Sequence, residues 1–436
     1  MQAKPIFQAL LVIAAVGVPG FLPFDSSGLT QHFGLLNAQS YTRIALSLTV
    51  GYVFVSLLAL SKAQRIKSGG GNSFSLDPDG FLLLFLLYGI FLLSLIKAGG
   101  KTDFLLGLYR ACEWMLAIGL CSAALGAFGN TQERHGPSDT FFRLVKYITT
   151  IPVVIVLIGV VVAPDWALSQ GGVRRLGGNL YQPNTLGLLA GIGAFMFWFH
   201  RPSLKSRIWA AVLITVMVLT YSRGAMIGFV LSIVVICITH RKRQVKILGL
   251  MAVPASILVA LAFSDVLYDQ IEPLLTRGQA LKDVGTLNSR TEVWVAAWRG
   301  ILDSPLIGHG YIFGPKDLPD YMYNKPWWAP PHAHNDIVNA GFAGGIGAAV
   351  LAAVIFIGVG YRLVTMDRSA SEKVPMVAVY IQLTVYAMLT PLLSSSFKAQ
   401  GIIFLLLMRY LAVTAPKQIR IGEMHRKIKN TPFNFS

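Results

Sequence analysis

The chain has 436 residues, of which 54% are hydrophobic and only 13% are charged. A water-soluble domain needs a larger polar shell, so this balance excludes an ordinary soluble enzyme and predicts an all-α polytopic membrane protein, with residues 1–436 as a single transmembrane domain. The formal net charge of +17 could suit nucleic acid, but the basic residues lie mostly in short segments between apolar runs. That placement is typical of membrane topology, and we expect no nucleic-acid partner.

Apolar runs long enough to cross a bilayer, roughly 18 residues or more, recur along the chain and predict about twelve transmembrane helices. The first run lacks a clear cleavage site and is interpreted as a helix, not a signal peptide. The first six helices are expected near 5–24, 42–61, 80–97, 103–126, 144–163 and 184–200. Two short helices within 208–239 then meet at a polar break at 221–224. The last four are expected near 247–264, 336–361, 374–394 and 400–415.

Basic residues occur in every second loop, as the positive-inside rule requires. The basic segments are 62–67, 134–146 (with Arg143 and Lys146), 201–207, 241–246, 362–373 and the tail 416–436. Both termini are therefore expected in the cytoplasm. The loops 25–41, 164–183, 221–224, 265–335 and 395–399 are expected on the other side. Among them, 265–335 forms one large loop between the ninth and tenth helices.

The sequence predicts no cofactor and no metal. Cys112, Cys121 and Cys237 lie inside apolar runs, so they form neither a disulfide framework nor a CxxC metal pattern. The chain has no nucleotide-binding GxxxxGK[ST] motif, and its cytoplasmic loops are too short for a nucleotide-binding domain. Any reaction must therefore draw on a pre-activated substrate or an ion gradient.

Four arginines are expected on the non-cytoplasmic side, where the positive-inside rule does not explain them: Arg174, Arg175, Arg223 and Arg290. Several guanidinium groups around one cavity would suit a diphosphate, because each gives planar, bidentate contacts to phosphate oxygens. The alternative for each arginine is a structural ion pair or a lipid-headgroup contact. That alternative is weakest for Arg223, because a charge near membrane depth is costly and usually functional.

Two histidines precede the tenth helix in Pro330-Pro-His-Ala-His-Asn-Asp336. A neutral imidazole at His334 could accept a proton from a sugar hydroxyl, and Asn335 or Asp336 could cap the helix and fix the ring. The alternative is a loop histidine bonded to backbone. His332 and His334 could also bind a metal, but no third ligand is evident.

Two further pairs have open roles. Arg110 and Glu113 share a face of the fourth helix, and the pair is either functional or a neutralised structural ion pair. Trp327 and Trp328 could stack on a sugar or a polyprenyl chain, although anchoring of the loop at the membrane interface is favoured.

The layout resembles the bacterial O-antigen ligase family, part of the O-antigen ligase/polymerase superfamily, whose architecture is similar to that of GT-C glycosyltransferases. Ser222-Arg223-Gly224 resembles the family's SRG element. Ser289-Arg290, with Trp294, Pro305, Gly308 and Gly310, resembles its arginine–tryptophan–PLxGxG element. His334-Asn335, followed by Gly345, resembles its histidine element, although Gly347 stands where the family usually has Thr or Val.

The resemblance implies a metal-independent, inverting glycosyltransferase of the bacterial inner membrane that completes lipopolysaccharide. The donor would be O-antigen polysaccharide on undecaprenyl diphosphate, and the acceptor a sugar hydroxyl of lipid A–core. His334 would be the general base, with Asn335 and His332 in support, at a site facing the periplasm. Arg223 and Arg290 would bind the diphosphate and stabilise its leaving charge. Arg174 and Arg175 are further candidates for that pocket.

Other functions remain open at this point. An O-antigen polymerase or an O-linked protein oligosaccharyltransferase of the same superfamily is the nearest alternative. A secondary transporter is a more distant one, since twelve helices and an intramembrane Arg–Glu pair would fit it. The sequence does not define the oligomeric state.

Overall fold

The computed structural model describes residues 6, 8–13, 49, 78–125, 137–169, 174–178, 180–239, 290–323, 330, 332–366, 370–394 and 398–414. These residues are mostly helical, and no β-strand occurs among them. The helices predicted at 5–24, 42–61 and 247–264 lie largely or wholly outside the described residues. So do the basic tail, the whole segment 265–289, and Trp327 and Trp328.

Nine long helices account for most of the described residues. They are α3 (Pro78–Ser94), α4 (Lys101–Ala124), α5 (Pro137–Val162), α7 (Pro183–Phe199), α8 (Leu204–Leu219), α9 (Arg223–Thr239), α14 (Asp336–Thr365), α15 (Ala370–Ala387) and α16 (Ala399–Thr414). Shorter elements connect them: η2 (Leu95–Lys97), α6 (Pro164–Ala167), α13 (Arg290–Asp303) and η3 (Gly314–Tyr321).

The all-α membrane character is confirmed by these helices. Three of them are long and apolar enough to cross a bilayer by themselves, namely Asp103–Ala124, Ser138–Val162 and Asp336–Thr365. Four shorter apolar helices accompany them at Phe81–Lys97, Pro183–Phe199, Arg223–Ile238 and Ala399–Ala412. The full number of twelve spans stays a prediction.

Most predicted helix positions agree with the structure, and two details differ. The break at 221–224 is confirmed, because α8 ends at Leu219 and α9 begins at Arg223. Arg143 and Lys146 were assigned to a loop, but both lie on α5, which begins at Pro137. The eleventh helix was expected to reach 394, yet α15 ends at Ala387. The segment 390–394 instead forms a turn that donates hydrogen bonds to Asp336 at the start of α14.

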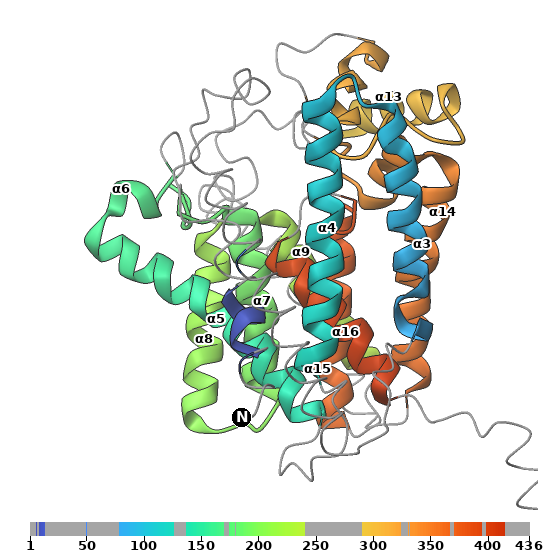
Figure 1. Ribbon diagram of the computed structural model, residues 1–436. Helices are drawn as coiled ribbons and strands as arrows, with labels where there is room; N and C mark the ends of the chain where they lie inside the picture. The colour runs from blue at the N-terminus through green and yellow to red at the C-terminus, as the bar shows by residue number, and fades with distance from the viewer. Residues whose placement is uncertain are drawn as a thin grey trace, which may run out of the picture.

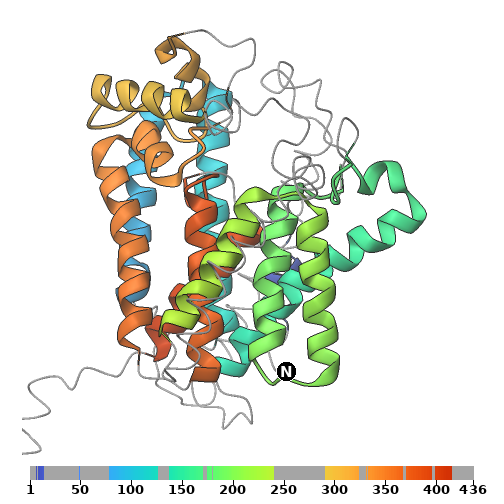
Figure 2. The ribbon, with the colours of Figure 1, turned by 180° about the vertical axis from the view of Figure 1, so that it is seen from behind.

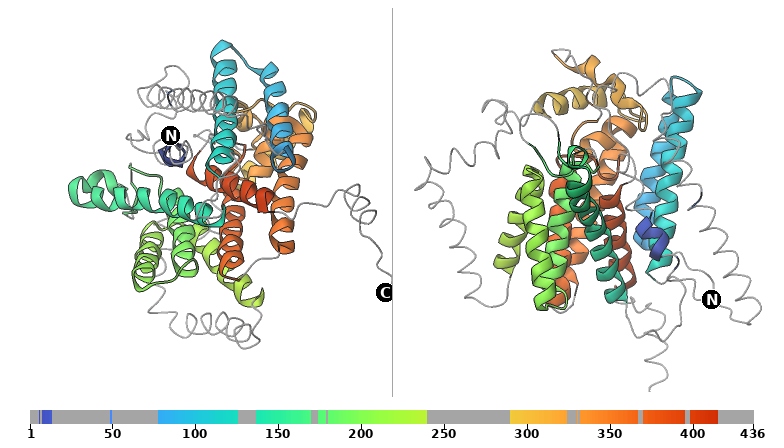
Figure 3. Two further views of the ribbon diagram at one scale, coloured as in Figure 1. Left: turned by 60° about the horizontal axis from the view of Figure 1, so that its bottom comes forward. Right: turned by 90° about the vertical axis from the view of Figure 1, so that its left-hand side faces the viewer.

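The helices form two groups (Figures 1 and 2). In one group α7 packs against α5, α8, α9 and α15, and in the other α3 packs against α4 and α14. α16 lies between the groups and contacts α3, α4 and α5. α13 lies across the end of the molecule at which α14 begins (Figure 3). We call this the α13 end.

α14 is two helices joined by a kink at Gly345, whose φ of 81° lies in the left-handed region. The kink frees main-chain groups that the loop after α13 then uses. His309 N–H donates to Phe342 O at 2.8 Å, Gly310 N–H donates to Ala343 O at 3.0 Å, and Ile346 N–H donates to Pro305 O at 2.8 Å. The loop therefore fastens α13 to α14.

Glycine is required on both sides of this junction. A Cβ at Gly345 would lie 2.4 Å from Pro305 O, and a Cβ at Gly308 would lie 2.5 Å from the carbonyl carbon of Ala343. Gly308 also has a positive φ of 66°. The PLxGxG and histidine elements, which are separate in sequence, are thus one packed unit in which two backbones touch.

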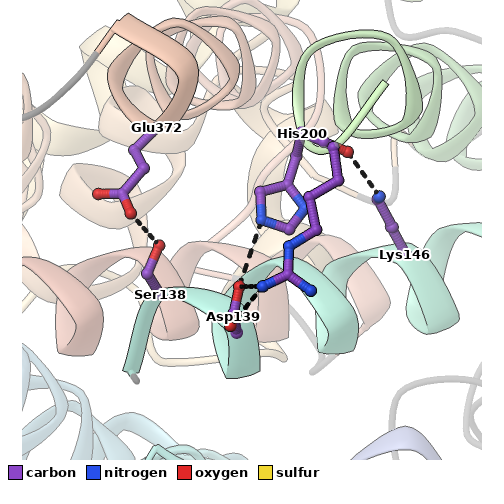
Figure 4. A network of polar contacts seen from close by, with 6 residues as sticks. Ser138, Asp139, Lys146, His200 and Glu372 are labelled. Atoms are coloured by element: carbon purple, nitrogen blue, oxygen red, sulfur yellow. Dashed lines mark hydrogen bonds and ion pairs between the residues drawn. The ribbon is translucent and has the colours of Figure 1, made fainter. Parts of the chain in front are cut away.

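A polar cluster at the opposite end joins α5, α7 and α15 (Figure 4). Arg201 donates to both carboxylate oxygens of Asp139 at 2.8 Å, and Lys146 donates to the main-chain oxygen of His200 at 3.1 Å. Ser138 donates to Glu372 of α15 at 2.8 Å. Since these groups satisfy one another, we interpret the cluster as a structural clasp between helix ends.

Candidate functional site

Arg223 begins α9 at the α13 end and has unsatisfied hydrogen-bonding capacity. Its Nε and Nη2 atoms are buried and find no hydrogen-bond partner among the described residues. Burying polar guanidinium atoms without partners is unfavourable, so Arg223 has donors available for a ligand with acceptor oxygens. The preceding Tyr221 has a positive φ of 50°, which turns the chain sharply between α8 and α9.

Arg175 approaches the same break from the loop before α7. Its Nε donates to Thr220 O at 2.9 Å, and its Nη2 donates to Asn184 Oδ1 at 2.8 Å. Burial lowers the pKa of Arg175, and the nearby charge of Arg223 lowers it further. Two guanidinium groups are therefore neighbours here. Arg174 is exposed beside them.

Arg290 is the first residue of α13 and brings a third guanidinium group to Arg223. Burial lowers the pKa of Arg290, and repulsion from Arg223 adds to the effect. The two arginines are far apart in sequence, and the attachment of α13 to the α14 kink places them together. Charge interactions thus link three of the four predicted arginines in the order Arg175, Arg223, Arg290, and we call this series the row.

His334 continues this row. Burial, together with the charge of Arg290, lowers its pKa from the ordinary 6.5 to about 4, while a hydrogen bond to the Leu389 main chain acts in the opposite direction. Since a bond that raises the pKa favours the protonated ring, we infer that the ring donates an N–H to the Leu389 carbonyl. The other ring nitrogen is left as an acceptor at neutral pH. His334 has a positive φ of 55°, a strained conformation of the kind found at functional sites.

His332 packs edge-to-face on His334, with ring centroids 4.3 Å apart. Its Nδ1 accepts a hydrogen bond from the main-chain N–H of His334 at 3.3 Å. Burial holds the pKa of His332 well below its usual range, and the nearby His334 and Lys398 act in the same direction. His332 is therefore a neutral neighbour that supports the backbone of His334.

The start of α14 is held by an extensive set of hydrogen bonds. Asn335 caps the helix, since its Oδ1 accepts from Ile337 N–H at 3.0 Å and Val338 N–H at 3.1 Å. The buried Asp336 carboxylate accepts from the N–H groups of Leu393 and Ser394, both at 2.8 Å, and from Ser394 Oγ at 2.6 Å. Asp336 thereby ties His334 to the turn after α15.

Asp336→Asn is expected to weaken this tie, because an amide keeps only one acceptor oxygen and places a donor against main-chain N–H groups. A lost buried hydrogen bond of this kind costs about 1–3 kcal/mol. Thermal unfolding in detergent should therefore show a lower Tm than the wild type. Asp165→Asn, a change at an exposed carboxylate, serves as the control and should leave Tm nearly unchanged. Equal Tm values for both variants would contradict the anchoring role.

Sequence reasoning missed two groups that the structure brings to the site. Lys398 precedes α16 and contributes to the lowered pKa of His332. Tyr386 of α15 lies near Arg290, and its hydroxyl is 3.0 Å from Thr185 Oγ1 of α7. Lys398 could have been found, because it lies in the turn 395–399 that was expected on the non-cytoplasmic side. The sequence around Tyr386 has no feature that distinguishes this residue from an aromatic residue of the apolar core.

Arg110 and Glu113 do not belong to this row. Arg110 Nη1 lies 2.7 Å from Glu113 Oε2, and Tyr109 Oη donates to Glu113 Oε1 at 2.6 Å. Glu113 is thus satisfied by its own helix, which favours the structural interpretation. Within the described ranges, His332 and His334 have no third His, Cys, Asp or Glu beside them that would complete a metal site.

Comparison with known protein families gives a match over part of the chain. Residues 211–353 match the family described as O-antigen ligase. This part of the chain belongs to the O-antigen ligase family. No curated protein sequence matches the chain. The matched O-antigen ligase region contains Arg223, Arg290 and His334, together with the α13–α14 junction, whereas Arg175 and Lys398 lie outside it. Members of this family are glycosyltransferase-like enzymes of the ligase and polymerase type.

Proposed function

We propose that the protein transfers an O-antigen glycan from undecaprenyl diphosphate to a sugar hydroxyl of lipid A–core. The observation that carries the proposal is the row of guanidinium groups that ends at a neutral imidazole. Arginine and lysine side chains lower the pKa values of Arg175, Arg290, His332 and His334, and only Tyr386, which acts on Arg290, has the opposite effect among their described side-chain charge neighbours. A site with this charge favours a diphosphate over a neutral or cationic ligand.

The proposed step is a direct displacement. The free ring nitrogen of His334 takes the proton of the acceptor hydroxyl, whose oxygen forms a bond to the anomeric carbon of the donor. The bond from that carbon to the diphosphate oxygen breaks, and the electron pair leaves with the diphosphate. Arg223 and Arg290, aided by Arg175 and Lys398, stabilise the added negative charge. One displacement inverts the anomeric configuration.

The membrane location supports amphiphilic substrates. The site lies at the end of apolar helices, where the diphosphate of a polyprenyl lipid would reach the guanidinium row while its chain stays in the bilayer. We propose that this end faces the periplasm of the bacterial inner membrane and that both termini are cytoplasmic. Because the leaving group is already activated and the arginines supply positive charge, transfer is expected to continue in the presence of a chelator.

Reconstitution of the purified full chain with defined donor and acceptor tests the proposal. The expected product is lipid A–core that carries the whole glycan. A lipopolysaccharide gel of a deletion strain separates the alternatives. Loss of a ligase leaves bare core, whereas loss of a polymerase leaves core with one repeat unit. Transport of the donor without glycan transfer would refute the proposal.

The protonation of His334 should determine the acid side of two pH profiles, that of kcat/KM and that of kcat. Because the pKa of His334 is about 4 in the free protein, the ring is neutral above that pH. The value of kcat/KM should therefore fall only near pH 4, where protonation of His334 removes the general base. The bound diphosphate adds negative charge beside the ring and raises its pKa, so kcat should fall on the acid side at a higher pH. Initial rates from about pH 3 to pH 8 measure both limbs. Coincident limbs would contradict the assignment.

A further inference from the structure

α13 has an outer surface that the catalytic proposal does not use. Its buried face, Val293, Ala296, Ala297, Gly300 and Ile301, packs toward α14. The exposed half is divided into two sectors at 3.6 residues per turn. One sector is apolar, with Val295, Trp298 and Leu302, and the adjacent sector is polar, with Glu292, Arg299 and Asp303. Trp298 is 56% exposed and Leu302 is 58% exposed.

The apolar sector continues into the loop that fastens α13 to α14. Leu306 is 87% exposed, and the neighbouring Pro305 O accepts the N–H of Ile346 at 2.8 Å. Ile346 begins a stripe of exposed apolar side chains along α14, which continues through Val350, Val354, Ile357, Tyr361 and Val364. Because α14 is a candidate membrane span, this stripe faces acyl chains. The surface of α13 is thus continuous with a lipid-facing surface.

The length of α14 places α13 at the membrane boundary. The part of α14 beyond its kink, from Ile346 to Thr365, has about 20 residues and is roughly 30 Å long, which matches the hydrocarbon thickness of a bilayer. Ile346 is therefore at the boundary, and Leu306 lies beside it. α13 runs across the helix ends rather than along them (Figures 2 and 3). A helix in this plane with Trp and Leu on one side and charges on the other is typical of the interface.

We propose that α13 is an interfacial helix whose face Val295–Trp298–Leu302, with Leu306, is embedded among the lipid acyl chains of the leaflet at the α13 end. This contact holds Arg290, the first residue of the same helix, at the depth of lipid phosphates. The inference about Arg290 rests on the proposed function, whereas the embedding of the helix does not.

Depth-dependent quenching tests the embedding without any transfer reaction. Single cysteines at Leu302→Cys and Glu292→Cys, in a chain with Cys112, Cys121 and Cys237 replaced by Ala, carry an environment-sensitive fluorophore in phosphatidylglycerol–phosphatidylcholine nanodiscs. A nitroxide on the lipid acyl chains should quench the label at Leu302→Cys strongly and the label at Glu292→Cys weakly. Aqueous iodide should show the reverse order.

The proposal is overturned if iodide quenches both labels equally, or if the Leu302→Cys label is shielded from both quenchers, which would indicate a protein partner. A second measurement addresses Arg290. The double variant Trp298→Ser with Leu302→Ser should reduce the rate of transfer from a polyprenyl donor in nanodiscs on the order of tenfold. The reason is that Arg290 would no longer be held at the depth of the donor's diphosphate. Trp298→Phe with Leu302→Ile should retain transfer. If quenching is as expected while transfer by all variants is absent, the proposed function fails and the interfacial helix stands.

Discussion

His334→Asn is expected to abolish glycan transfer while the protein still inserts and folds. Asn is the appropriate replacement because it tolerates the positive φ of 55° at this position better than most residues. It keeps a polar side chain but has no imidazole nitrogen to accept the proton of the acceptor hydroxyl. Loss of a general base reduces rates about 10²–10⁴-fold. The measurement is the initial rate of the reconstituted reaction at saturating donor and acceptor.

His200→Asn is the matched control. His200 is also buried enough for its pKa to fall to about 4, but it belongs to the clasp at the opposite end and stacks on Phe142 at 4.1 Å between centroids. Its replacement should affect stability more than the rate per folded molecule. Near-normal transfer by His334→Asn would show that the acceptor hydroxyl is deprotonated by another group, and the proposed base would be wrong.

Arg290→Ala should give the second large effect. Removal of this guanidinium takes away the cation that we propose contacts the developing charge on the diphosphate, and loss of one such group costs about 10²–10³-fold in kcat. The kcat of Arg290→Lys should lie between the values of the wild type and Arg290→Ala, because Lys keeps the charge but not the bidentate geometry. At Arg223 we likewise expect kcat to decrease from the wild type to the Lys variant to the Ala variant. Two buried nitrogens of Arg223 have no partner among the described residues.

Arg201→Ala provides the control for a lost guanidinium. Arg201 forms its ion pair with Asp139 at the clasp, and its side chain is 67% exposed, so the pair contributes little to stability. Transfer by this variant should be close to wild type. If Arg290→Ala changes only the affinity for the acceptor, and kcat at saturating donor is retained, the arginine does not act on the leaving diphosphate.

The sequence was informative where a local pattern has one physical cause. The polar break at 221–224 ends α8 and starts α9 because an unpaired arginine is costly inside an apolar helix. Asn335 was predicted as a possible cap, and it caps α14 because its short side chain reaches the free N–H groups of the first turn. The assignment of Arg143 and Lys146 to a loop was wrong. Charged residues at the end of a membrane span can belong to the helix as readily as to the loop, and here both lie on α5.

The sequence by itself determined that the chain is a helical membrane protein and which cationic and imidazole groups lie on the non-cytoplasmic side of the predicted topology. Only the tertiary structure decided that Arg175, Arg223, Arg290 and His334 are neighbours. Their proximity depends on the Gly345 kink, where freed main-chain groups bind the loop at Pro305–Gly310, and on Asp336, which binds the turn after α15. Such contacts join residues far apart in the chain, and no local periodicity encodes them.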